Sequence, residues 1–239
     1  GPKRDIVGEL ARAMRAQELR YMIALHHFEN WWFFPHHVPA YDTADPRYAG
    51  LYGEAHNLDG KVGPDFFDQD RPSQKFMQTW RAKTYEVVDK YQPDLLYTDG
   101  GVPFGEVGLS LIAHLYNADA GRRGGTLEVV YTCKQRSEGR WIEDLERGVM
   151  AKINPDPWQT DTSIGDWYYN KNWKYRGADW VIQMLVDIVS KNGNLLINVV
   201  QRPDGTLDAE VEQMLAQMAE WIAINGEAIY GTRPWTTFG

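Results

Sequence analysis

The segment formed by residues 94–101, Asp-Leu-Leu-Tyr-Thr-Asp-Gly-Gly, ends a short run of strand-like residues in a carboxylate and two glycines. A carboxylate that directly follows a buried parallel strand lies at the edge of an α/β sheet where active sites form. Asp99 is therefore our first candidate for a catalytic nucleophile. The alternative is that Asp-Gly-Gly is turn chemistry alone, because turns favour Asp and Gly for steric and hydrogen-bonding reasons.

A carboxylate that attacks a glycosidic carbon needs a second carboxyl group, which protonates the leaving oxygen and later deprotonates water. The acid-rich loop of residues 137–147 offers Glu138, Glu143, Asp144 and Glu146. We interpret Glu146 as the acid that turns inward, although a solvated position is the alternative for it. We expect the other three to be ordinary solvated charges.

Histidines and aromatic residues follow the first predicted strand. His26 and His27 end that strand and Trp31 comes soon after, so we expect a polar and aromatic cluster on the same face as Asp99. Together with His36-His37 they raise the alternative of a metal site. Adjacent histidines point to opposite sides of an extended chain, however, and their spacing matches no known ligand set. We therefore expect no metal, and hydrogen bonding to sugar hydroxyls is a better use of His26 or His27.

The composition narrows the class of protein. The chain has 239 residues, of which 43% are hydrophobic and 24% charged, as expected for one compact soluble domain. A formal net charge of −8 argues against nucleic acid or an anionic membrane as the main partner. The single cysteine excludes an intrachain disulfide. The first ten residues show no secretory signal, so a cytoplasmic location is expected. Aromatic residues make up 13% of the chain, which suits a carbohydrate site or simply a core rich in rings.

The hydrophobic periodicity predicts alternating helices and strands. Helices are expected at residues 4–17, 73–91, 103–117, 178–191 and 208–224, and strands at 21–25, 94–98, 127–132, 158–164 and 195–200, with long loops at 26–72 and 133–157. This alternation indicates a fold related to the (β/α)₈ TIM barrel. About five to six strands are recognisable, whereas a closed barrel has eight, so we predict a shortened or incomplete barrel in a single domain, residues 1–239.

Several ordered motifs resemble the family 29 α-L-fucosidases over nearly the whole chain. They lie at residues 91–101, 103–105, 146–148, 158–170, 192–198, 202–205 and 225–235. The resemblance implies a retaining glycoside hydrolase that acts on fucosylated glycans without metal or organic cofactor. It implies that Asp99 is the nucleophile and assigns the acid/base role to Glu146. The candidate substrate contacts are His26, His27, Trp31, Tyr97, Trp158 and Trp167.

The chain also departs from the family pattern. It lacks the early His-His-Glu/Asp-Gly-Phe segment, the first barrel strands and a β-sandwich after Thr236. Open sheet edges are unstable unless they are covered or paired, so we expect a homo-oligomer or a rearranged short barrel whose long loops cover the gap. The alternative function is a non-catalytic or vestigial sugar-binding protein on the same scaffold. A related sugar such as galactose is a further alternative within enzymes.

Overall fold

The computed structural model describes residues 3–56 and 71–238. The chain comprises two compact units, residues 1–133 and 134–239, and each is described by itself. The single catalytic domain expected over residues 1–239 stays a prediction. None of the described helices is both long and apolar enough to cross a membrane.

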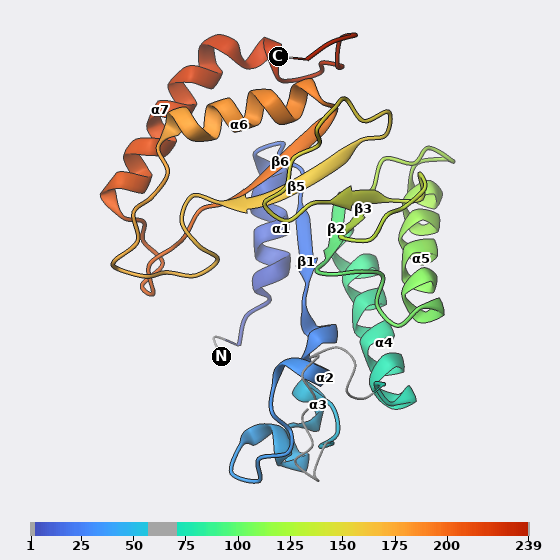
Figure 1. The fold of residues 1–239 in the computed structure, drawn as a ribbon. Coiled ribbons are helices and arrows are strands. Elements are labelled where there is room, and N and C mark those ends of the chain that lie inside the picture. Colours follow the sequence, from blue (N-terminus) through green and yellow to red (C-terminus); the bar gives the residue numbers. More distant parts are fainter. Residues whose placement is uncertain (1–2, 57–70, 239) are drawn as a thin grey trace. The chain divides into compact units, whose positions relative to one another are not determined.

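Three parallel strands form the centre of the first unit (Figure 1). Helix α1 (Ile6–Ala16) precedes β1 (Met22–Leu25), which pairs with β2 (Leu95–Thr98), and β2 pairs in turn with β3 (Val130–Cys133). The register aligns Leu25 with Thr98. The residues that follow these two strands therefore leave the sheet at the same level.

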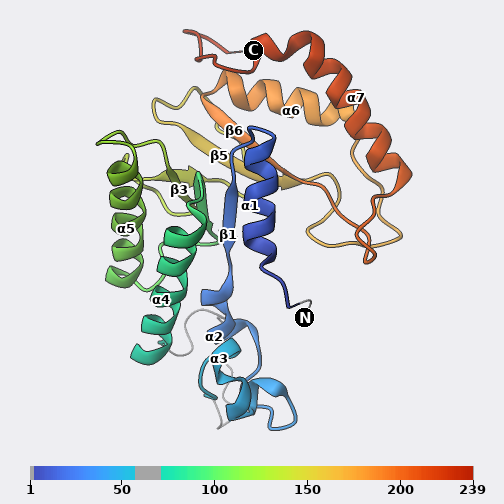
Figure 2. The same ribbon diagram turned by 180° about the vertical axis from the view of Figure 1, so that it is seen from behind.

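Two long helices of the first unit, α4 (Gln74–Tyr91) and α5 (Glu106–Arg122), lie side by side in both views (Figures 1 and 2). The predicted serine cap of α4 is confirmed, since the Ser73 side chain accepts a hydrogen bond from the Phe76 backbone N–H. The helices and strands of this unit contribute a fully buried apolar set: Val88, Leu96, Leu111, Leu115 and Tyr131.

The long loop predicted after the first strand contains short helices. These are η1 (His27–Glu29), α2 (Asn30–Phe33), η2 (Asp42–Ala44), η3 (Pro46–Tyr48) and α3 (Ala49–Tyr52). Each has only three or four residues, which is too few to leave a periodic pattern in the sequence. The remainder of the predicted loop, residues 57–70, lies outside the described residues.

The second unit also contains three parallel strands, β4 (Ile142–Asp144), β5 (Trp158–Ser163) and β6 (Gly193–Asn198). The prediction of a continuous loop from residue 133 to 157 is wrong at β4. This strand has three residues, two of them acidic, and it is recognised by its pairing with β5 and not by a pattern in the sequence. At the start of β6, a Cβ on Gly193 would lie 2.5 Å from the Trp158 ring, so this strand pair requires glycine there.

Helices α6 (Ala178–Ser190) and α7 (Ala209–Asn225) pack against each other, and α6 packs on β6. The last short helix is η4 (Gly226–Ala228). The predicted left-handed residue after α6 is confirmed at Asn192, whose φ is +70°. Residues of both helices and of the β5 end form the apolar core of this unit: Ile164, Ala178, Val181, Val211 and Met214.

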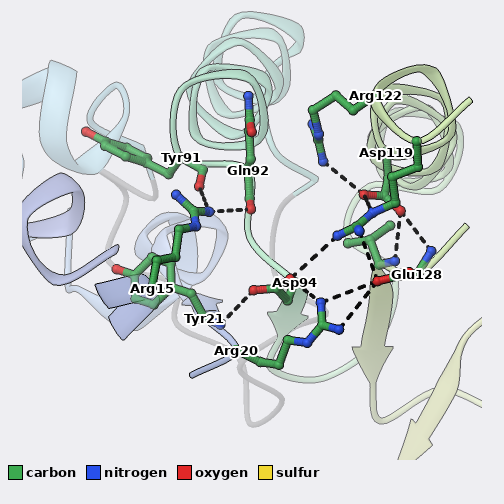
Figure 3. A network of polar contacts seen from close by, with 11 residues as sticks. Arg15, Arg20, Tyr21, Tyr91, Gln92, Asp94, Asp119, Arg122 and Glu128 are labelled. Carbon is green, nitrogen blue, oxygen red and sulfur yellow. Dashed lines mark hydrogen bonds and ion pairs between the residues drawn. The ribbon is translucent and has the colours of Figure 1, made fainter. Parts of the chain in front are cut away.

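A network of ion pairs ties together the amino ends of the three strands in the first unit (Figure 3). Asp94 accepts hydrogen bonds from the Tyr21 backbone N–H at 2.9 Å and from Arg20 at 3.0 Å. Arg20 also contacts the Glu128 carboxylate at 3.4 Å. Because these residues precede β2, β1 and β3, the network fixes the strands at the end opposite to Asp99.

Asp119 of α5 anchors the same network and is 1% exposed. Its carboxylate accepts hydrogen bonds from the backbone N–H groups of Glu128 (2.8 Å) and Val129 (3.0 Å), and from Arg123 Nε (2.9 Å). Burial by itself raises the pKa of Asp119, but these donors outweigh burial and lower the pKa to about 2. The charged form of Asp119 therefore holds the end of α5 against the start of β3.

We predict that Asp119→Asn lowers the free energy of unfolding by about 1–3 kcal/mol at pH 7, because buried donors lose a charged acceptor. The exposed control in α4, Glu86→Gln, should leave the free energy of unfolding unchanged within about 0.5 kcal/mol. The folded-state pKa of Asp119 lies below its unfolded value, so its contribution is present above about pH 4 and is lost as the pH falls to about 2. Urea denaturation at pH 7 and pH 3 measures both effects, and equal midpoints for the two variants at pH 7 would contradict the prediction.

Candidate active site

Asp99 directly follows β2, and its carboxylate contacts Tyr97, Gly100 and His26. Tyr97 Oη donates a hydrogen bond to Asp99 Oδ1 at 3.2 Å, and the Gly100 backbone N–H donates to the same oxygen at 3.0 Å. The other oxygen, Oδ2, lies 3.4 Å from His26 Nε2 at the end of β1. We call these four residues the Asp99 cluster.

The Asp-Gly-Gly sequence is both a turn and the support of the carboxylate. Gly100 has a φ of +76°, which an L side chain rarely adopts, and this conformation accompanies the hydrogen bond from its N–H to Asp99. The Asp99 side chain is 30% exposed, while Tyr97 is 4% exposed. A buried phenol and a fixed backbone N–H thus orient a carboxylate that solvent can still reach.

His27 points away from this cluster and toward α4. Its ring centroid lies 6.1 Å from that of Trp80, and the two residues border a cavity of about 240 Å³ together with Gly53, Phe76 and Lys83. Burial, followed by the positive charge of Lys83, lowers the pKa of His27 to about 4. The imidazole is therefore neutral at physiological pH.

Trp31 is 4% exposed and packs inside the short-helix segment. Its ring stacks on that of His56 with centroids 3.9 Å apart, and His56 Nε2 lies 2.7 Å from the Trp31 carbonyl oxygen. The predicted sugar contact at Trp31 does not match this placement, since the side chain is occupied by packing. The two histidines of the second pair also differ, because His36 is buried and His37 is not.

Glu146 follows β4 in the second unit, and two donors hold its carboxylate. Lys134 Nζ donates to Glu146 Oε2 at 2.6 Å, and Trp167 Nε1 donates to Oε1 at 3.2 Å. The Glu146 side chain is 44% exposed, so it is fixed at the surface of its unit, whereas the sequence predicted a residue drawn inward.

Trp167 itself is held by its neighbours. The Arg147 guanidinium lies 4.8 Å from the Trp167 ring centroid, a cation–π contact, and donates to Asp166 Oδ1 at 2.8 Å. The Trp167 backbone N–H donates to that same oxygen at 2.9 Å. We call Lys134, Glu146, Arg147, Asp166 and Trp167 the Glu146 cluster. Trp167 is 40% exposed, which suits the predicted sugar contact.

Two further carboxyl groups lie beneath the Glu146 cluster. Asp144 is 1% exposed and accepts a hydrogen bond from Gln159 Nε2 at 2.9 Å, so its prediction as a solvated charge is wrong. Asp161 of β5 lies 3.9 Å from Lys134 Nζ, and its Oδ1 is buried without a hydrogen-bond partner among the described residues. Burial, followed by the charge of Asp144, raises the pKa of Asp161 to about 7.

Trp158 lies at the other end of β5 from this cluster. It is the first residue of the strand, has no exposed surface, and donates from Nε1 to the Lys191 carbonyl at 2.9 Å. A side chain in this position packs the core and offers no face to a sugar. The sequence-based sugar contact therefore fits Trp167 and does not fit Trp158.

Sequence reasoning missed Lys134, Asp161 and Asp166. Lys134 directly follows β3, so the rule that selected Asp99 would also have found it, had that strand been placed correctly. The environment of Asp161 had no sequence signal, because it depends on β4 and on Lys134. Within residues 3–56 and 71–238, no group of three His, Cys, Asp or Glu side chains is arranged to hold a metal ion.

Comparisons with known proteins match α-L-fucosidases along almost the entire chain. The family model described as "Alpha-L-fucosidase" matches residues 1–227. The human plasma α-L-fucosidase is 30% identical over 253 residues, which cover 98% of this chain and 47% of that protein. The chain thus spans about half the length of the curated relatives it matches.

Solved structures show the same fold. A Thermotoga maritima α-L-fucosynthase is 26% identical with a TM-score of 0.73, covering 99% of this chain and 48% of that one. A Thermotoga maritima α-fucosidase in complex with fucose is 26% identical with a TM-score of 0.68, covering 99% of this chain and 49% of that one. The fold class, a partial (β/α) barrel, is thereby confirmed.

We predict that the His27 ring stays neutral in the folded protein down to about pH 5, because its pKa is near 4. In the urea-unfolded chain the same ring should titrate near pH 6.5. NMR of the ring carbon-bound protons, assigned with His27→Gln, measures both values. Because the unfolded state takes up this proton first, the His27 contribution to stability falls as the pH drops from about 6.5 to about 4. A folded-state midpoint at pH 6 or above would refute the burial argument.

Proposed function

The chain belongs to the α-L-fucosidase family, and from this premise we propose that it hydrolyses terminal α-L-fucosyl linkages with retention of anomeric configuration. Retention requires two successive displacements through a covalent glycosyl-enzyme intermediate. The observation that carries the proposal is the Asp99 cluster. It presents an oriented, accessible carboxylate directly after a barrel strand, as a nucleophile requires.

In the proposed first step, an Asp99 oxygen attacks the anomeric carbon and the glycosidic bond breaks. The hydrogen bonds from Tyr97 and Gly100 to Oδ1 keep the carboxylate plane fixed during the attack. His26 lies beside Oδ2, and an imidazole there can also reach a sugar hydroxyl. We therefore propose His26 and Tyr97 as positioning groups around the reacting carbon.

Glu146 is proposed to handle the protons. It gives its proton to the leaving oxygen in the first step and takes a proton from water in the second, so that water releases the sugar from Asp99. Support comes from its position after β4 and from the two donors, Lys134 and Trp167, that fix its carboxyl group. The Trp167 ring is proposed to contact the substrate through its exposed area.

The proposed substrates are fucosylated glycans or oligosaccharides. A solved relative with this fold was determined in complex with fucose. The neutral His27 ring borders a cavity between the short helices and α4, and a neutral imidazole can both donate and accept hydrogen bonds. We therefore retain His27 as a proposed contact for a sugar hydroxyl.

We predict that Asp99→Gly lowers the rate of hydrolysis of an aryl α-L-fucoside on the order of a thousandfold or more, because the covalent step loses its nucleophile. Azide should restore part of the turnover by attacking from the vacated side, which gives the β-L-fucosyl azide. Reaction rates and product NMR measure both effects.

The exposed aspartate of η2 gives the matched control, Asp42→Gly, which should retain wild-type activity. Each protein is assayed over a range of concentrations, because self-association is expected, and thermal unfolding checks that each variant is folded. An unmutated chain inactive at every concentration would point to the non-catalytic sugar-binding alternative. Greater activity on an aryl α-galactoside would point to the other enzyme alternative.

We further predict that Glu146→Ala lowers hydrolysis of a fucosylated disaccharide by about 10²- to 10⁴-fold, the usual contribution of acid–base catalysis. Formation of the intermediate from a dinitrophenyl fucoside should change much less, because that leaving group needs no proton. Comparison of the two substrates, with azide added to assist the second step, measures the difference. Equal losses on both substrates in the first step would reject Glu146 as the proton donor.

A further inference from the structure

The second unit brings three carboxyl groups close together, and the Lys134 ammonium lies beside two of them. Lys134 Nζ lies 2.6 Å from Glu146 and 3.9 Å from Asp161, and the buried Asp144 faces Asp161. If all three acids were ionised, these carboxylates and Lys134 together would carry two uncompensated negative charges in a partly buried place. Like charges held this close keep at least one proton near neutral pH.

The strand register explains why the two aspartates meet. Asp144 of β4 pairs with Gln159 of β5, and Asp161 is two residues further on, so it projects from the same face as Gln159. Gln159 occupies one oxygen of Asp144. Asp161 Oδ1, in contrast, is buried and has no donor among the described residues. A proton shared between the two carboxyl groups satisfies the buried oxygen that the protein donors leave unbonded.

Building on the proposed function, we propose that Asp161 is a positioning residue for Glu146: it shares one proton with Asp144 and, while neutral, leaves Lys134 bonded to Glu146. Ionisation of Asp161 draws Lys134 toward it, and the Lys134–Glu146 contact loosens. The groups that face Asp161 are Asp144, Lys134 and Glu146. No bond other than these hydrogen bonds and ion pairs changes.

This arrangement makes the activity depend on pH through a residue that does not touch the substrate. The raised pKa of Asp161, about 7, places its ionisation at neutral pH. Below that pH, the Lys134 ammonium stays bonded to Glu146. Above it, Lys134 is attracted to two carboxylates, those of Glu146 and Asp161. The alkaline fall in kcat/KM should therefore follow the ionisation of Asp161.

The test uses Asp161→Asn in the full chain, because an amide keeps the shape and a donor for Asp144 but cannot ionise. Its kcat/KM for the fucosylated disaccharide at pH 6 should stay within about threefold of wild type, and the alkaline limb should move up by about one pH unit or more. The matched control is Glu143→Gln, an acid of β4 that contacts Arg136 at 3.9 Å, and its profile should match wild type. A variant profile that superimposes on wild type, or falls equally at every pH, would overturn the proposal.

A second readout does not require turnover. Carboxyl ¹³C NMR of the free protein should show an aspartate titrating near pH 7 that disappears in Asp161→Asn, and the Lys134 ¹⁵Nζ signal should follow the same transition. Absence of that titration, or a Lys134 signal that ignores it, overturns the positioning role even in an active enzyme. An inactive chain that shows both signals supports the proton-sharing contact, and the failure then lies with the proposed hydrolysis.

Discussion

In-register pairing of short parallel strands is the constraint on which each unit depends. A parallel register brings the carboxyl ends of neighbouring strands to one edge, so the residue after each strand leaves the sheet beside its counterpart. In the first unit, pairing of Leu25 with Thr98 places His26 against Asp99. In the second, pairing of Asp144 with Gln159 brings Asp161 to the same face as the buried acid. A slip of one residue would turn each of these side chains to the other face.

Charged residues at the two ends of the strands in the first unit have different surroundings. At the amino ends of the strands, Asp94 and Asp119 are matched by arginines and backbone N–H groups, so their charges stabilise the fold. At the carboxyl ends, Asp99 accepts hydrogen bonds from a phenol and a backbone N–H, lies beside His26 and keeps an exposed fraction of 30%. The buried, fully bonded Asp119 thus lies at one end of these strands, and the accessible carboxylate of Asp99 lies at the other.

In the second unit, carboxyl groups outnumber the positive charges beside them. Glu146 and Asp161 share the ammonium of Lys134, and the more buried Asp144 accepts a hydrogen bond from Gln159. The Trp167 indole, held by Arg147 and Asp166, fixes Glu146 from the other side. Because these groups contact one another, the environment of Glu146 depends on the charge of its neighbours as well as on its own position.

The sequence by itself determined the alternation of helices and strands, the family, and the position of Asp99, because apolar periodicity, caps and the strand–acid–glycine pattern are local signals. It placed the Ser73 cap and the left-handed Asn192 correctly for the same reason. Only the tertiary structure decided that Trp158 and Trp31 are core residues while Trp167 remains exposed, since burial depends on what packs against a ring. Strand β4 and the partnership of Asp144 with Asp161 also had no local signature. Both arise from pairing between segments distant in sequence, and the charge state of a carboxyl group is set by the groups that the fold brings to it.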